Sequence, residues 1–546
     1  MLGGGVAGLT AAHELAERGF EVDLYEQRGL LGGKARSYRL LPERTACQPA
    51  LAGLPGEHGF RFFPAFYRHL PDSMRRIPFP GQADGVLGNL VPASRLQMAR
   101  LALPPLVIPA RLPRSADDLQ LALRGLVDAH FGVAPQDLVF LAERFWVLLT
   151  SCTERRYAEW ENVSWWDFSQ AERRSSGYRR YLADGLTRSL VAARAREIST
   201  RTGGYIGLRL LFDAFTPGVN VDRVRCGPTS EVWIDPWRRH LADLGVRFHL
   251  DTTVVRIEVG DGRVTGVNLA GADTPRAQAE FYVAATPAEV MSRLLTPELL
   301  DAEPRLEGLR QLQTRWMNGI MFYLHRDVPL VRGHTIYIDS PWSLTSVSQA
   351  QFWPGVDLAE AGEGQVGGIL SVDVSDWTTK GVRFGKPAME CTRGEVAAEV
   401  WAQLKQHLNR PGRPVLEDGN LAGWFLDDDI RPPNPHHVKD INLEPLLINT
   451  VGSWPRRPPA TTAIANLVLA SDYVQTSTDL ATMEGANEAA RRAVNGILDA
   501  VGSGSPRCQL WPATEPAVFA PWQRLDRLRF RLGQPHLAMN GRPAAP

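Results

Sequence analysis

The chain has 546 residues, which is too long for one compact core, so we expect two or three domains. Its formal net charge is zero and its hydrophobic and charged contents, 44% and 22%, are ordinary, so no overall field draws it to nucleic acid. The 5 cysteines form no C-x-x-C pair and no apolar run is long enough to span a bilayer, so we expect a cytoplasmic protein without a disulfide framework.

The first residues predict a dinucleotide-binding turn. Apolar residues recur at helical spacing over residues 9–16, and residues 20–25 alternate like a strand that ends on Glu26. A tight turn, close approach of a pyrophosphate and close helix packing each require a glycine, and the terminal acid accepts hydrogen bonds from a ribose. The predicted cofactor contacts of this turn are Gly3, Gly5, Val6, Ala7 and Gly8.

Only Met1 and Leu2 precede the turn, whereas a central strand needs about five residues. We therefore expect that further apolar residues upstream would complete this strand.

A second glycine turn follows the acid. Gln27 leads into Gly33, Lys34 and Arg36, an arrangement that a nicotinamide enzyme does not need but that suits the longer cofactor FAD. The two turns, with the helix and Glu26 between them, resemble the N-terminal fingerprint of the flavin amine oxidase and phytoene desaturase superfamily. The resemblance implies an α/β fold: a Rossmann-type FAD-binding domain built from three separated segments, and an α+β substrate domain with a mixed sheet and inserted helices.

This division predicts the order of segments along the chain. We expect FAD-binding segments at 1–87, 216–300 and 445–502, helical and sheet parts of the substrate domain at 88–215 and 301–444, and a tail at 503–546.

An aromatic loop at residues 56–77 occupies the place where, in the family, a loop lies along the flavin ring. The resemblance implies that Gly59, Phe60 and Arg61 contact the cofactor, and that His58 and Arg61 line the reaction site. The alternative is a hydrophobic loop whose few polar residues are satisfied internally.

Residues 88–215 lack strand alternation and predict helices, including 119–132 and 143–152, with an N-cap at Ser164 or Asn162. The basic, apolar and proline-rich run at 95–113 is either a membrane contact or a connector.

Residues 226–287 return to a sheet pattern. A helix is expected to end at Gly245, and Asp261-Gly262 predicts a hairpin turn between two strands. The resemblance implies that Val254 and Val255 lie on the adenine and that Ala285 helps to close the cofactor crevice.

Strand-like runs fill residues 311–440, with a helix at 395–408. The triplet Asp427 to Asp429 and the pair His436-His437 raise a metal hypothesis, but they lack ligand spacing on one helix face, so we predict no metal.

Residues 466–502 carry a second signature, in which a strand ends on Asp472 and a long helix opens near Met483, Glu484 and Ala486. It resembles the closing motif of the family, in which the acid binds a ribityl hydroxyl. Two positions depart from that motif: Ser471 replaces a glycine, and Asn487-Glu488 replaces a pair of small residues.

The tail contains a predicted helix at 519–533 with leucines and arginines at helical spacing. It is either a basic helix at a membrane surface or a helix docked through its leucines.

The chemistry expected with FAD is removal of hydride from a C–H bond. The strand at 315–325 has no lysine, whereas amine oxidases of the superfamily commonly place one there, and Trp454 stands where the family supplies an aromatic residue beside the flavin. We therefore predict a desaturase or dehydrogenase of a lipophilic, isoprenoid-like substrate, in peripheral contact with the inner face of the membrane, and leave its electron acceptor (oxygen or a quinone) open. A flavin amine or amino-acid oxidase, an FAD-dependent double-bond isomerase and a non-enzymatic FAD-binding scaffold are the alternatives.

Overall fold

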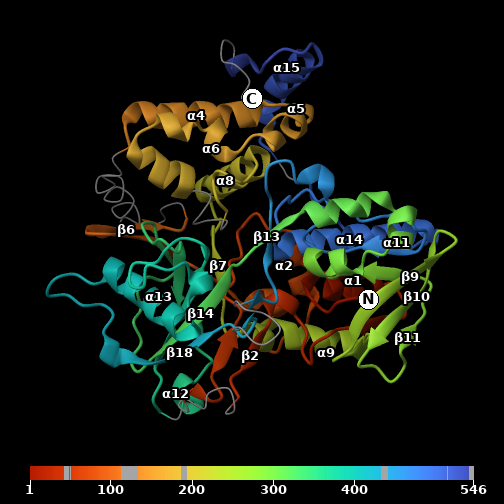
Figure 1. Cartoon of the computed structure of the whole chain (residues 1–546), viewed down its shortest axis with the longest axis horizontal. Helices are drawn as coiled ribbons and strands as arrows, with labels where there is room; N and C mark the ends of the chain where they lie inside the picture. Colours follow the sequence, from red (N-terminus) through yellow and green to blue (C-terminus); the bar gives the residue numbers. More distant parts are fainter. Residues whose placement is uncertain are drawn as a thin grey trace.

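The computed structural model describes residues 1–41, 48, 51–111, 133–185, 193–362, 364–431, 441–512 and 515–539. Three bodies are visible in Figure 1: a layered half with α1, α14 and the hairpin β9–β10, a half built on a larger sheet with β14 and β18, and a block of helices that carries α4, α8 and α15. In the first half, α1 packs against α14, although more than 460 residues separate them in the sequence, whereas the end of the described chain lies at the helical block beside α15.

A parallel sheet forms the centre of the first half. β1 (Asp23–Tyr25) pairs with β8 (Arg247–His249), and β12 (Tyr282–Ala284) pairs with β22 (Leu467–Leu469), in both cases in parallel. Leu2 joins the two pairs through parallel bridges to Tyr25 and Ala284. The spatial order is therefore β8, β1, Leu2, β12, β22, so that strands from three distant parts of the sequence share one sheet.

Helices from both ends of the chain cover this sheet. α1 (Val6–Ala16) is buried along almost its whole length and packs on α14 (Met483–Ala500). The amide of Asn487 donates hydrogen bonds of 2.9 Å to the hydroxyls of Thr10 on α1 and Ser73 on α2 (His69–Arg76). The asparagine that departs from the family motif thus ties three helices together.

The predicted elements of residues 226–287 are confirmed. α9 (Asp235–Asp243) ends before Gly245, whose φ of +88° suits a glycine, and β9 (Thr253–Gly260) pairs with β10 (Arg263–Ala270) across Asp261-Gly262. Both turn residues have positive φ, 51° and 69°, as a tight hairpin requires.

The second half is built on a mixed sheet of seven strands in the order β18, β14, β17, β16, β15, β5, β6. All neighbouring pairs are antiparallel except β15 with β5. The strands predicted within 311–440 are β14 (Asn318–Leu324), β15 (His334–Tyr337), β16 (Leu344–Ser348), β17 (Gly368–Val374) and β18 (Leu421–Leu426). The predicted helix is α13 (Arg393–Leu408), which begins with a capping box between Thr392 and Glu395.

The prediction of helices from residue 88 onward is wrong for its first part. Residues 90–109 form β4 (Leu90–Pro92), β5 (Arg95–Arg100) and β6 (Leu103–Pro109). The part of the run 95–113 that the structure describes is therefore not a connector: β5 and β6 pair in antiparallel, and β6 is the edge strand of the seven-stranded sheet. The partner of β5 is β15, more than 200 residues away in sequence, so the local pattern did not reveal this pairing. The helix predicted at 119–132 lies outside the described residues.

The helical block contains α4 (Pro135–Thr150), α5 (Thr153–Ala158), α6 (Trp165–Phe168) and α8 (Thr200–Phe215). Ser164 is the N-cap of α6, as predicted, and its hydroxyl accepts a hydrogen bond from the Asp167 N–H at 3.1 Å. α15 (Ala520–Arg531) packs on α4 and α5. In the part of the chain that the structure describes, we find no helix with the length and apolar content needed to cross a membrane.

Candidate functional site

The glycine turn at the start of α1 depends on the absence of side chains. Gly3 has a φ of +112°, and a Cβ atom on Gly8 would lie 2.0 Å from the carbonyl oxygen of Gly3. By contrast, the nearest atom to a Cβ on Gly5 would be Cα of Gly33, at 3.9 Å. Two glycines are therefore required by packing, and the third leaves backbone accessible at the N-terminus of a helix, which fits a dinucleotide phosphate.

Glu26 lies beside this turn and is almost fully buried. Its carboxylate accepts hydrogen bonds from the N–H groups of Gly4 (2.8 Å) and Arg28 (3.0 Å), and burial raises its pKa. The N–H of Gly32 donates to the Gly4 carbonyl at 2.9 Å, so the second glycine turn lies directly against the first. Gln27, next to Glu26, is exposed.

The basic residues of the second turn have protein partners. Lys34 Nζ lies 3.1 Å from Glu289 Oε1, and the buried Arg36 pairs with Glu444 (2.8 Å) and with Asp429. Arg36 also donates to the Gly33 carbonyl at 2.7 Å. Through these contacts, Arg36 links the second glycine turn to Asp429 and Glu444 and stabilises the turn. Glu289, which the sequence pattern did not single out, is the acid that holds Lys34.

The loop at 57–61 is held by charges. The buried Glu57 accepts two hydrogen bonds from Arg225, at 2.8 and 3.2 Å, and another from the Thr229 N–H at 2.9 Å. Arg61 donates to the Gly59 carbonyl at 2.5 Å and to the carbonyl of Lys34, so this loop contacts the second glycine turn. The structure thus brings together the two stretches that the sequence assigned to the flavin.

His58 lies in a buried cluster of acids. Its Nδ1 is 2.6 Å from Asp427 Oδ2 and 3.5 Å from Asp429 Oδ2. Burial opposes the charge on His58, but the two carboxylates outweigh it and raise its pKa to about 8. Asp427 also accepts a hydrogen bond of 2.6 Å from the Asn318 amide. Two members of the Asp427 to Asp429 triplet therefore pair with His58 and with arginines, whereas His436-His437 lies outside the described residues.

Asp373 on β17 is a site residue that sequence reasoning missed. Its Oδ1 accepts a hydrogen bond of 3.2 Å from the Phe60 N–H and would lie 2.6 Å from a Cβ on Gly59. Burial raises the pKa of Asp373 to about 7, although Arg61 acts in the opposite direction. In sequence, Asp373 looks like any polar residue of an alternating strand, and only the pairing of β17 with β14 brings it to the loop.

The closing motif lies at the end of β22 and the start of α14. Ser471 has a negative φ, so the turn does not need the usual glycine, and its hydroxyl donates to Asp472 Oδ1 at 3.3 Å. Met483 opens α14, whose N-cap Thr482 accepts a hydrogen bond from Gly485, and Ala486 follows in the first turn.

Glu484 performs a structural task in this region. Its buried carboxylate accepts hydrogen bonds of 2.8 Å from the N–H groups of Arg68, His69 and Leu70 and thereby caps the start of α2. These contacts occupy its side chain, so only its backbone at the N-terminus of α14 is left for the cofactor.

The remaining predicted residues lie in different surroundings. Trp454 is half-buried under the guanidinium of Arg201, 4.4 Å from its ring, with Tyr157 at 5.2 Å, and thus faces the helical block. The Ala285 N–H donates to the Leu2 carbonyl at 2.9 Å, next to the first turn. On β9, Val254 is half-buried and Val255 is 52% exposed.

A cavity of about 200 Å³ lies where the helical block, β13 (Gln313–Arg315) and the segment before Trp454 meet. Trp316 and Trp377 line it and contact each other edge to face at 5.4 Å. Its charged residues pair with one another: Arg194 with Asp376 at 3.0 Å, and Arg315 with Glu197 at 3.4 Å. The cavity therefore presents aromatic surface and charges that largely cancel.

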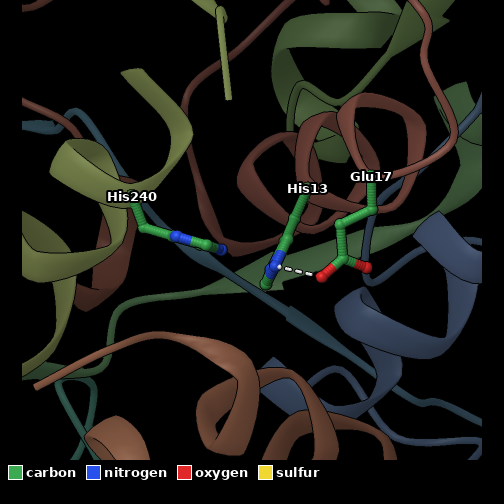
Figure 2. Close-up of side chains that lie close together, drawn as sticks. All are labelled: His13, Glu17 and His240. Carbon is green, nitrogen blue, oxygen red and sulfur yellow. Dashed lines mark ion pairs between the residues drawn. The ribbon is translucent and has the colours of Figure 1, made fainter. Parts of the chain in front are cut away.

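A second group of potential metal ligands, His13, Glu17 and His240, lies on α1 and α9 (Figure 2). The indole N–H of Trp237 donates to Nδ1 of His13 at 3.2 Å, so a neutral His13 carries its proton on Nε2, which lies 3.1 Å from Glu17. A metal would need the lone pair of that Nε2. A hydrogen bond from Trp237 and an ion-pair contact with Glu17 thus account for both ring nitrogens of His13.

Comparison with known proteins agrees with the resemblance found in the sequence. The sequence profile of the family described as flavin containing amine oxidoreductase matches residues 6–498. No curated protein gives a significant match in sequence.

Solved structures with the same fold include cyclohexylamine oxidase from Brevibacterium oxydans IH-35A, with a TM-score of 0.60, 14% identity and coverage of 92% of this chain and 98% of that one. Putrescine oxidase bound to putrescine has a TM-score of 0.57 and 14% identity, with coverage of 92% of this chain and 98% of that one. An oxidoreductase from Methanosarcina mazei has a TM-score of 0.54 and 13% identity, with coverage of 90% of this chain and 97% of that one.

Proposed function

Because this chain belongs to the family of flavin-containing amine oxidoreductases and is therefore an FAD-dependent oxidoreductase, we propose that it removes hydride from a C–H bond of a lipophilic, isoprenoid-like substrate. The observation that supports this proposal is the composition of β14, which passes the loop from Glu57 to Arg61. A Cβ on Gly319 would lie 2.4 Å from Cα of Gly59, yet β14 contains no Lys, Arg, His, Asp or Glu. An apolar substrate needs no ionisable partner there.

We interpret the parallel sheet as a Rossmann-type domain that holds FAD. The backbone of the Gly3 to Gly8 turn would bind the pyrophosphate, and Glu26 and Asp472 would accept hydrogen bonds from the ribose and ribityl hydroxyls. Gly59 to Arg61 would lie along the ring. When bound, FAD supplies the hydride acceptor, and the surrounding chain orients the substrate and excludes water.

Formation of a double bond releases a proton as well as a hydride. Asp373 is suited to hold that proton, because it lies against Phe60 and Gly59 and its pKa of about 7 keeps it close to the protonation midpoint at neutral pH. His58, Arg61 and Trp454 are the other side chains that we propose at the reaction site. His58 would act through its charge on the loop.

The role of Asp373 predicts a pH profile. Since the raised pKa leaves the carboxyl protonated below about 7, activity should rise with pH through that value. Asp373→Asn should lower kcat by at least about 100-fold and abolish this step in the profile, while the FAD content stays the same. If the pH dependence of activity were unchanged in the variant, Asp373 would not be the group that holds the proton.

The competing proposal is an amine oxidase, because cyclohexylamine and putrescine oxidases share the fold. The acids Glu197 and Asp376 in the cavity favour this alternative only if an amine displaces their arginine partners.

Anaerobic reduction of the bound flavin separates the candidates. Polyprenyl and carotenoid-type compounds should bleach the flavin absorbance, and mono- and diamines should not. Product analysis then distinguishes a dehydrogenated compound from a double-bond isomer, and reoxidation by oxygen or by a quinone identifies the acceptor. Rapid bleaching by amines, with hydrogen peroxide released in air, would replace our proposal with the amine oxidase.

A further inference from the structure

The C-terminal helix α15 has its polar side toward the protein and its apolar side toward solvent. Asp526 is only 3% exposed, whereas Trp522, Leu525, Leu528 and Leu532 are exposed by 44%, 41%, 59% and 73%. This is the reverse of an ordinary surface helix. Of the two alternatives for this helix, the structure contradicts docking through the leucines.

Polar contacts hold α15 in place. Asp526 pairs with the buried Arg155 at 3.0 Å and accepts a hydrogen bond from the Cys152 N–H at 2.8 Å, at the start of α5. Gln523 donates to the Leu149 carbonyl at 2.9 Å, and Arg527 pairs with Glu154 at 2.8 Å. These four contacts fix the orientation of the helix and thereby turn its leucines outward.

The apolar surface continues beyond α15. Trp146 of α4 contacts Trp522 edge to face at 5.7 Å, and a hollow of about 280 Å³ between α4, α15 and residues 536–538 is lined by Trp146, Trp522, Leu525 and Leu537. Trp146 is 40% and Leu537 44% exposed. α15 lies at the upper edge of the molecule in Figure 1, on the outer side of the helical block.

Arginines flank this apolar surface. At 100° per residue, Arg529 falls beside Trp522, and Arg524 and Arg531 fall beside Leu528. Arg524 and Arg531 are exposed, and no acidic partner lies within ion-pair distance of either among the described residues. An apolar strip with tryptophan and leucine, bordered by arginines, matches an interface between acyl chains and anionic headgroups.

We infer that the surface formed by α15 and Trp146 docks on an anionic lipid bilayer, with Leu528 and Leu532 inserted at the acyl boundary and the arginines at the phosphates. This anchoring is independent of the reaction that the flavin site performs.

Flotation of the full-length, FAD-loaded protein with vesicles tests the inference. Vesicles of phosphatidylcholine with phosphatidylglycerol should carry the protein, vesicles of phosphatidylcholine alone should carry much less, and added salt should weaken the binding. The double variant Leu528→Ser/Leu532→Ser should lower partitioning by at least about tenfold. Arg524→Gln and Arg531→Gln should each lower it about fivefold.

Val382→Ser is the matched control. Val382 is 45% exposed on a loop of the half that contains the seven-stranded sheet, so its substitution should leave vesicle binding unchanged. Thermal unfolding should be the same for all variants, since the substituted side chains are exposed. Absence of binding to anionic vesicles, or equal loss in the control, would overturn the inference. So would a dimer in solution that the leucine variant dissociates, because the surface would then bind a second copy of the chain.

Discussion

The two parts of the proposed cofactor site achieve their shape by different means. At the turn from Gly3 to Gly8, the backbone fits because side chains are missing, and the contact that matters is steric: 2.0 Å between a hypothetical Cβ of Gly8 and the Gly3 oxygen. At the loop from Glu57 to Arg61, the backbone is held by buried charges from Arg225, Asp373 and Asp427. The first part should therefore be insensitive to pH, whereas the second should depend on pH. Added volume should disturb both parts, because a Cβ on Gly59 would lie 2.6 Å from Asp373 Oδ1.

The largest effect is expected from Gly8→Ala. The new methyl group meets a backbone oxygen that cannot rotate away, so α1 must separate from the sheet. We expect protein that retains less than about a tenth of the normal FAD and unfolds at a lower temperature, measured by flavin absorbance and calorimetry. Gly394→Ala, where nothing lies within 4 Å, is the control and should retain the cofactor. Normal FAD content in Gly8→Ala would contradict the steric explanation.

The next largest effect should come from Arg36→Met. This change leaves the buried carboxylates of Asp429 and Glu444 with one cation fewer, and the loss of one partner of a buried ion pair costs about 3–5 kcal/mol. Arg247→Met, which removes an exposed pair with Asp23, should cost much less, because solvent screens that pair. Chemical denaturation measures both. Equal losses would mean that burial of the charges around Asp429 is unimportant.

His58→Gln should change the pH dependence of stability. A histidine with a raised pKa contributes its full stability below its ordinary pKa of 6.5, and loses that contribution as the pH rises through about 8. The difference corresponds to about 2 kcal/mol. Denaturation of the wild type and variant between pH 6 and 9 should show a decline only in the wild type. If the free energy of unfolding of the two proteins depended on pH in the same way, His58 would not stabilise the cluster through its charge.

The smallest effect should come from Asp472→Ala. If its carboxylate accepts one hydrogen bond from a hydroxyl of FAD, the loss is about 1 kcal/mol, or about fivefold in affinity. Asp499→Asn on the exposed end of α14 is the control and should leave the affinity unchanged. Titration of apoprotein with FAD measures this difference. An affinity equal to that of the control would show that Asp472 is not a ligand.

Much of the fold could be predicted because its signals are local. The turn, α1 and β1 follow one another within 25 residues, and the periodicities that predicted β14, β17, α13 and α14 are properties of short windows. β4 and β5 could not be predicted in this way, since their partners β7 (Arg223–Arg225) and β15 come from distant parts of the chain, and β6 pairs with β5.

The sequence by itself determined the cofactor turns and the order of the elements, because glycine positions and periodicity are written in consecutive residues. Only the tertiary structure decided what the charged residues do. It places Asp373 beside the loop from Glu57 to Arg61, pairs Glu484 with the start of α2, and turns the leucines of α15 toward solvent by burying Asp526. The physical reason is the same in each case: a charge acts on whatever lies within a few ångströms of it, and those neighbours are set by folding and not by sequence distance.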